Sequence, residues 1–225
     1  MTENILKRFD DITERLASET VHRDYCVLQK TWNSDVIRYA GRYISPGRDQ
    51  NALCLGSFLG AFEIALSDVM NKVVAVDHEC FLPSWRPPNV EFVSTDLDGV
   101  DWQLPKEHFD LCFMIEVLEH LLWSPIPLLK WISRHCGILA ISTPDDREWP
   151  PMESPFARYG HFLTVPTASP GCRPNPKPMF HCKQYGQAEF VELLDFCGFR
   201  VLEFQRLTEH KHQMLLIAAS RSQEK

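Results

Sequence analysis

The chain has 225 residues, 44% of them hydrophobic, which suits one α/β domain with a modest extension and a complete core. No apolar run is long enough to cross a bilayer, and the charged N-terminal run MTENILKRFDDITERL lacks the apolar stretch of a secretory signal. The net charge of −7 argues against general nucleic-acid binding, which depends on a basic face. We therefore expect a cytoplasmic protein.

The first fifty residues have the pattern of two amphipathic helices. Apolar residues recur on one face between residues 5 and 16. A second helix is predicted to start near Asn33 and Ser34, both good N-cap residues, and to stop before the breaker pair Pro46-Gly47. Residues 1–50 are thus predicted to form a helical extension, which either packs on the edge of the domain or covers a binding cleft.

From residue 51 onward, short apolar runs alternate with helical patterns, which is typical of a parallel sheet covered on both faces. The last two β-like runs are joined so closely that they must be antiparallel. We therefore predict a doubly wound, Rossmann-like α/β fold with a mostly parallel seven-stranded sheet and an antiparallel C-terminal strand. The predicted strands are NALCL, KVVAV, NVEFV, FDLCFMI, GILAIS, FRVLEFQRL and QMLLIAAS; the predicted helices are GAFEIALSDV, 128–133 and 188–197.

Eight cysteines are scattered singly from Cys26 to Cys197, with no CxxC pair. Cys54 and Cys112 fall inside apolar strand-like runs, where free cysteine behaves as a small buried hydrophobe. This spacing predicts reduced thiols rather than a disulfide framework.

The stretch LCLGSFLGAFEIAL, residues 53–66, places a glycine turn between the first strand and the next helix. In open α/β folds, ligands bind at the carboxyl edge of the sheet, where a helix N-terminus presents unpaired N–H groups. Gly56 and Gly60 lack Cβ atoms, so an extended ligand can lie against the backbone there. Glycine is common at any strand-to-helix turn, so this turn alone is weak evidence.

Acids at the next two strand ends strengthen the prediction. Asp77 follows KVVAV, twenty-one residues past Gly56, a spacing that suits a carboxylate bound to the two hydroxyls of a ribose. Asp96 and Leu97 follow the third strand, where an acid and an apolar neighbour suit the amino edge and the face of an adenine. An acid at a strand end is also a common turn residue. The three features in order predict an adenosine site.

Five phrases of the sequence, LCLGSFLGAF, VVAVDHE, FVSTDLDG, FDLCFMIEVLEHL and GILAISTPD, are similar to those of a known group, with a weaker echo in HCKQYGQAEFVELLDFCGFRV. Through them, residues 51 to about 145 resemble the class I S-adenosylmethionine-dependent methyltransferase superfamily, and within it the small-molecule methyltransferases. The resemblance implies that residues 51–225 form a methyltransferase domain with S-adenosyl-L-methionine as its cofactor.

The resemblance also implies a role for each part of the cofactor site. The turn glycines would flank the methionine part, the acid after the second strand would hold the ribose, and the pair after the third strand would hold the adenine. Glu116 would face the pocket from the end of the fourth strand. The predicted cofactor-binding residues are Gly56, Ser57, Gly60, Asp77, His78, Asp96, Leu97 and Glu116.

Two positions of the turn depart from the family pattern, which usually has an acid where this chain has Cys54 and a glycine where it has Phe58. In the family, that acid organises the glycine turn or contacts the cofactor's amino group. A nicotinamide dinucleotide does not fit the turn, because its pyrophosphate needs three glycines, and Phe58 and Phe62 stand at the second and third positions.

Histidines are the candidates for a general base. A methyl group on a positively charged sulfur is already activated, so alignment of the acceptor, with roughly 7–11 kcal/mol of barrier lowering, outweighs a base that adds about 10²–10⁴-fold. The predicted catalytic residues are His120, His161 and His181, although a structural or solvated role fits each of them too. The set His161, Cys172, His181 and Cys182 matches no common zinc spacing, so no metal is predicted.

An acid-free excursion follows the fifth strand: residues 154–188 contain six prolines and no acid. Residues 145–185 are predicted to form a lid inserted into the domain. Its basic residues, in a chain that is acidic overall, predict an anionic acceptor such as a carboxylate, a phosphate or a nucleotide-linked sugar; a proline-stiffened solvent loop fits equally well. The predicted acceptor-binding residues are Arg158, Tyr159, Arg173 and Tyr185.

Together these features predict a methyltransferase that modifies an oxygen or nitrogen of a small, anionic metabolite. Two alternatives remain open: a methyltransferase of RNA or protein, and a degenerate member that serves as an interaction module, which Cys54 and Phe58 favour. The predicted partner is a small-molecule acceptor. A membrane is not expected, nucleic acid is disfavoured by the charge, and the sequence does not predict an oligomeric state.

Overall fold

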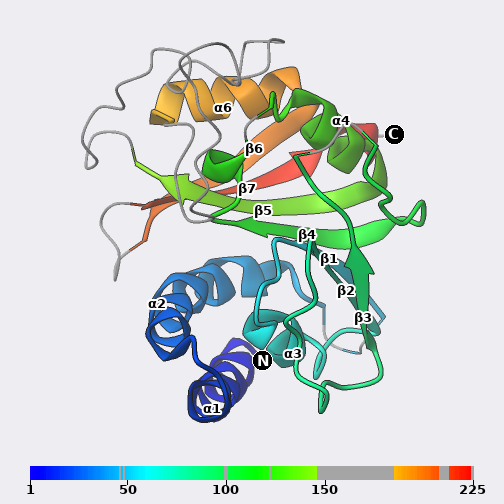
Figure 1. Ribbon diagram of the computed structural model, residues 1–225. Helices are drawn as coiled ribbons and strands as arrows, with labels where there is room; N and C mark the ends of the chain where they lie inside the picture. Colours follow the sequence, from blue (N-terminus) through cyan, green and yellow to red (C-terminus); the bar gives the residue numbers. More distant parts are fainter. Residues whose placement is uncertain are drawn as a thin grey trace, which may run out of the picture.

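The computed structural model describes residues 1–45, 47, 49–98, 101–121, 123–145, 185–207 and 213–223. Their strands are β1 (Asn51–Leu55), β2 (Lys72–Asp77), β3 (Val90–Ser94), β4 (Phe109–Ile115), β5 (Cys136–Pro144), β6 (Phe199–Arg206) and β7 (Gln213–Ser220). Within this described part, all seven lie in one sheet in the order β3-β2-β1-β4-β5-β7-β6 (Figure 1). The pairs from β3 to β5 are parallel, whereas β7 runs antiparallel to both β5 and β6. The predicted doubly wound fold is confirmed.

Helices cover both faces of this sheet. The helices α1 (Thr2–Glu19), α2 (Arg23–Ala40) and α3 (Ala61–Leu66) lie on one face, and α4 (Ile126–His135) and α6 (Gln187–Phe196) lie on the other (Figure 1). Short 3₁₀ turns occur at η1 (Gly41–Tyr43), η2 (Leu118–His120) and η3 (Arg221–Gln223). None of these described helices is long and apolar enough to span a membrane.

The central strands are apolar along most of their length because their middle residues are buried on both faces of the sheet. Successive side chains of a strand point to opposite faces, so Ala52 and Cys54 join the core under α1 to α3, and Leu53 and Leu55 join the core under α4 and α6. The six described cysteines are free thiols, and five of them are buried. The face on which Cys54 lies decides which helices can reach it.

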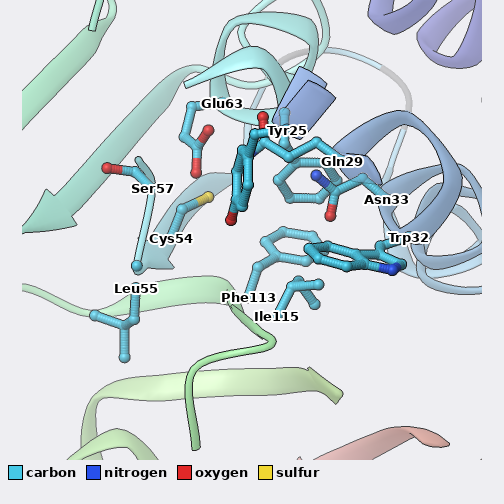
Figure 2. A pocket seen from close by; sticks show the side chains of 12 residues that line it. Tyr25, Gln29, Trp32, Asn33, Cys54, Leu55, Ser57, Glu63, Phe113 and Ile115 are labelled. Atoms are coloured by element: carbon cyan, nitrogen blue, oxygen red, sulfur yellow. The ribbon is translucent and has the colours of Figure 1, made fainter. Parts of the chain in front are cut away.

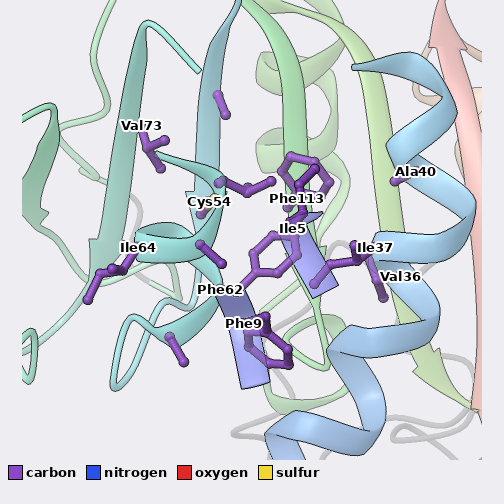
Figure 3. Packing of buried hydrophobic residues seen from close by; sticks show 14 of the residues in the cluster. Ile5, Phe9, Val36, Ile37, Ala40, Cys54, Phe62, Ile64, Val73 and Phe113 are labelled. Carbon is purple, nitrogen blue, oxygen red and sulfur yellow. The ribbon is translucent and has the colours of Figure 1, made fainter. Parts of the chain in front are cut away.

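The N-terminal helices share a core with the sheet. Ile5 and Phe9 of α1 and Ile37 of α2 are buried with Phe62 of α3 and Phe113 of β4 (Figure 3). The Phe62 and Phe113 rings meet edge to face, with their centroids 4.9 Å apart. The extension is therefore packed into the protein through its apolar face.

The predicted start of the second helix is wrong. The helix α2 begins at Arg23, ten residues before Asn33, and Asn33 and Ser34 are buried in its interior. The Ser34 hydroxyl donates to the carbonyl of Lys30 at 2.6 Å, a bond within the helix, instead of capping it. The sequence pattern suggests N-caps at these two positions because Asn and Ser are common there, but in this helix both residues belong to a buried polar face.

Removal of the Phe9 ring should destabilise the whole protein. The ring is fully buried between α1 and the sheet, so we expect Phe9→Ala to lower the free energy of unfolding by about 3–5 kcal/mol. Urea denaturation measures this. Phe196→Ala, which truncates a ring that is 57% exposed, is the matched control and should change stability little. Equal effects of both changes would mean that α1 does not share the core.

Candidate functional site

The backbone between β1 and α3 takes a left-handed conformation at three positions. The φ angles are 77° at Gly56, 42° at Phe58 and 75° at Gly60. The amides of Gly56 and Ser57 donate to the carbonyl of Val76, at 2.8 and 3.1 Å, which ties the turn to the end of β2. Glycine adopts such angles freely, whereas a phenylalanine there is strained.

Phe58 is held in this conformation by its ring and its amide. The ring packs against Tyr25, Phe81 and His22, with centroids 4.6, 5.1 and 5.3 Å away. The amide donates to Oδ2 of Asp77 at 2.9 Å. The phenylalanine thus keeps the backbone shape of the glycine that it replaces.

Asp77 ends β2 beside this turn, with 14% of its side chain exposed. Its Oδ1 accepts from the amide of His78 at 2.7 Å and lies 2.7 Å from Nδ1 of the same residue. Each carboxylate oxygen offers about two acceptor positions, so Oδ2 has room for a further donor beyond the amide of Phe58. The exposed His78 ring can move aside, so the carboxylate can accept hydroxyl donors from a ligand.

A small cavity of about 30 Å³ lies next to the turn, under α2 (Figure 2). Tyr25, Gln29, Trp32 and Asn33 of α2 form one wall, and β1, the turn, α3 and the end of β4 form the rest. The volume is enough for about one water molecule or a group of that size. Helix α2 therefore packs on the sheet and also lines this cavity.

Two polar atoms at this cavity lack hydrogen-bond partners. Within the described chain, Oγ of Ser57 and Oε1 of Gln29 are buried without a partner. A buried polar group in this condition costs about 1–3 kcal/mol, and native proteins keep few of them. The two oxygens therefore indicate a place for a water molecule or a polar part of a ligand.

Glu63 of α3 is a polar group at the cavity that the sequence analysis missed. It is only 4% exposed and lies close enough to the thiol of Cys54 for the two groups to influence each other's pKa. Burial raises the pKa of its carboxyl to about 8, and the charge of Asp77 adds to the shift. In the sequence, Glu63 looks like one more residue of an amphipathic helix. The signal that could have identified it is its position three residues after Gly60, in the helix that follows the turn, together with the lack of an acid at Cys54.

A second polar cluster lies where β4 and β5 end. The hydroxyl of Ser142 donates to Oε1 of Glu116 at 2.6 Å, and Glu116 lies close enough to the fully buried Glu119 for the two carboxyls to influence each other's pKa. Burial raises the pKa of Glu116 to about 7 and that of Glu119 well above its ordinary value. His120 completes the cluster, with Nε2 3.7 Å from Oε1 of Glu119. Two carboxyls this close titrate as a pair, because the charge of one disfavours ionisation of the other.

Three of the other predicted site residues have different contacts in the structure, and five lie outside the described chain. Asp96 is exposed and accepts from the amide of Asp98 at 2.9 Å, as a turn residue does. Leu97 packs on the core under α4 and α6. Tyr185 is fully buried, and its ring packs against Phe190 in the same core. The predicted residues outside the described part are Arg158, Tyr159, His161, Arg173 and His181.

Two aliphatic side chains lie over the glycines of the turn. A Cβ atom at Gly56 would collide with Val117, and one at Gly60 would collide with Leu82. An adenosyl group that lies against these glycines must therefore displace both side chains. The polar groups around the turn fit such a ligand, and its apolar surface requires this local rearrangement.

Comparisons with solved structures find the same fold. A 1,6-didemethyltoxoflavin-N1-methyltransferase of Burkholderia thailandensis, with bound S-adenosylhomocysteine, matches with a TM-score of 0.61 and 17% identity over 96% of this chain and 87% of that one. An S-adenosylmethionine-dependent methyltransferase of Mesorhizobium loti matches with a TM-score of 0.60 and 15% identity over 82% of this chain and 97% of that one. The magnesium protoporphyrin IX methyltransferase of Synechocystis, with bound SAM, matches with a TM-score of 0.55 and 16% identity over 88% of this chain and 82% of that one.

No protein-family model matches the chain, and no curated protein matches its sequence. At identities this low, the likeness to solved structures shows the fold alone. The chain has the fold of the class I S-adenosylmethionine-dependent methyltransferases, so the resemblance stated from the sequence is confirmed at the level of the fold.

Substitutions at Phe58 can test the strained turn. Phe58→Ala and Phe58→Gly both remove the ring packing, but only alanine keeps the penalty of a positive φ. We expect the glycine variant to be more stable than the alanine variant by about 1–2 kcal/mol in urea denaturation. The matched control is the same pair at Phe81, where alanine should be equal or better. Equal stability of the two Phe58 variants would contradict the strain.

The free energy of unfolding should fall as the pH rises from about 5 to 8. Burial raises the pKa values of Glu63, Glu116 and Glu119 above the ordinary 4.5, so the folded protein holds protons that the unfolded chain has released. Each group that is protonated only in the folded state then lowers stability by about 1.4 kcal/mol per pH unit.

Glu63→Gln isolates one of these groups, because glutamine is similar in shape and does not ionise. Urea denaturation at several pH values should give the variant a shallower slope than the wild type up to a pH of about 8. Glu3→Gln, at an exposed position of α1, should leave the slope unchanged. A Glu63→Gln curve parallel to that of the wild type would contradict the shift at this residue.

Proposed function

We propose that the chain is an S-adenosylmethionine-dependent methyltransferase that transfers a methyl group to an oxygen or nitrogen of a small, anionic metabolite. One observation carries the proposal: the glycine turn after β1, the carboxylate of Asp77 after β2 and the buried polar cavity adjoin one another at the carboxyl edge of the sheet. Open α/β sheets bind ligands at this edge.

The groups at this edge suit the two polar ends of the cofactor. Asp77 would accept from the ribose hydroxyls, and Ser57 and Gln29 would bind the amino-acid end, where their buried oxygens lack partners in the described chain. Bound S-adenosylmethionine would supply a methyl group on a positively charged sulfur. The structural neighbours that were solved with bound SAM or S-adenosylhomocysteine support this assignment.

The acceptor's proton would pass to the cluster of Glu116, Glu119 and His120. A general base works best when its pKa is close to the working pH, and burial raises the pKa of Glu116 to about 7. The hydroxyl of Ser142 holds the Glu116 carboxyl in place at 2.6 Å. The cluster lies at the end of β5, the strand that leads into residues 145–185, where Arg158 and Arg173 remain the predicted anchors of an anionic acceptor.

Binding of S-adenosylhomocysteine tests the proposal directly. At 100 times its dissociation constant, the ligand should stabilise the protein by about 2.7 kcal/mol, which is a thermal shift of roughly 5–10 °C for a chain of this size. Asp77→Ala should abolish the shift, because it removes the carboxylate beside the turn. The control is Asp49→Ala, at an exposed position away from the turn, and it should shift like the wild type.

An interaction module without methyl transfer is the second candidate. Val117 and Leu82 cover the two glycines, and the cavity measures only about 30 Å³. Wild-type protein that shows no thermal shift with millimolar S-adenosylhomocysteine would favour this module and overturn the enzyme.

A further inference from the structure

We propose that Glu63 of α3 takes the place of the acid that is missing at Cys54, and that it binds the α-ammonium group of the cofactor's methionine part. This inference rests on the proposed function and names a residue that holds the ligand at that same site.

The fold brings Glu63 to the position of the missing acid. The side chain of Cys54 points to the face of the sheet that α3 covers, and Glu63 lies in the first turn of that helix. The Glu63 carboxyl and the Cys54 thiol are close enough to influence each other's pKa, and Figure 2 shows both side chains on the same side of the cavity, near Ser57. A carboxyl can thus reach this spot either from the strand, with a short side chain, or from the helix, with a longer one.

The small thiol and the long acid belong together for an electrostatic reason. Two carboxylates at this spot would repel each other in a poorly solvated place, and one would have to take up a proton. Cysteine at position 54 leaves the room and the single negative charge to Glu63. The departure from the family pattern then means that the acid lies on helix α3, at Glu63, instead of on strand β1, at position 54.

The surroundings of Glu63 lack a cation. None of the described residues forms an ion pair with it, and the titratable groups that bear on it are the Cys54 thiol, the Asp77 carboxylate and the Tyr25 phenol. A buried carboxylate is stable only when it is paired with a positive group. The site therefore suits a ligand that brings its own positive charge.

The cavity beside Glu63 has the size and the acceptors for an ammonium group. Its volume of about 30 Å³ accommodates a group as large as a water molecule. Oε1 of Gln29 and Oγ of Ser57, both buried without partners in the described chain, lie on its walls. An ammonium group has three N–H donors, and Glu63, Gln29 and Ser57 together supply three acceptors.

Binding should release a proton. Without a cation, burial raises the pKa of Glu63 to about 8, so its carboxyl is protonated at neutral pH. When the ammonium group enters, the carboxyl O–H bond breaks, the proton goes to the solvent, and the carboxylate pairs with the ammonium group. Calorimetry in buffers of different ionisation enthalpy at about pH 7 should detect this proton for the wild type and not for Glu63→Gln.

Two ligands and two variants test the inference. Calorimetry compares S-adenosylhomocysteine with 5′-methylthioadenosine, which lacks the amino-acid part. Glu63→Gln should weaken binding of S-adenosylhomocysteine roughly 10–100-fold, as for the loss of a hydrogen bond to a charged group, and should leave methylthioadenosine binding unchanged. The double variant Cys54→Asp, Glu63→Gln returns the acid to the strand and should regain most of the affinity.

Each outcome separates the inference from the proposed function. Equal affinity of the wild type and Glu63→Gln for S-adenosylhomocysteine would overturn the role of Glu63 and leave the cofactor site in place. A wild type that binds neither ligand would overturn both. Retained methylthioadenosine binding shows that a variant is folded. If Glu63→Gln does not fold, Gln29→Leu replaces it: it should weaken S-adenosylhomocysteine alone, and unchanged affinity would count against the ammonium site.

Discussion

The amide of Phe58 and the carboxylate of Asp77 form the hydrogen bond on which the site depends, at 2.9 Å. It joins the end of β2 to a turn whose backbone is left-handed at three positions. Because the turn is fixed, α3 begins at Ala61 and presents Glu63 to the face of β1 on which Cys54 lies. A phenylalanine in a glycine conformation is tolerated because its ring is buried against other aromatic rings and its amide is paired, so local strain is offset by packing.

The N-terminal helices join the domain's core and the site in one structure. The apolar face of α1 completes the core on one side of the sheet, and α2 lays a polar face, with Gln29 and Asn33, over the cavity. A polar face directed at the interior is costly unless it is satisfied there. Because Oε1 of Gln29 has no hydrogen-bond partner in the described structure, the cost of burying this oxygen is not offset there. Such costs gather at functional sites, where a ligand supplies the missing partner.

The sequence predicts those parts of the molecule that follow from hydrophobic periodicity. Every strand of the sheet agrees with a predicted apolar run, and for the central strands the reason is burial on both faces. The start of α2 is missed because a buried polar face looks like an N-cap. Glu63 is missed for a related reason: its role depends on which side chain of a neighbouring strand it meets, and periodicity carries no such information. Asp96 accepts a hydrogen bond within a turn, and its role in the cofactor site stays a prediction.

The two groups of buried acids on this edge of the sheet are suited to different tasks by their neighbours. Glu63 faces a cavity with two unpartnered oxygens and no cation in the described chain, so its ionised form requires a positive ligand. Glu116 accepts from Ser142, and burial raises its pKa to about 7, so its charge can change without a ligand. Because their surroundings differ in this way, Glu63 is suited to binding a cation and Glu116 to proton transfer. A methyl donor that carries a fixed positive charge would need an acid such as Glu63, and an acceptor that must lose a proton would need one such as Glu116.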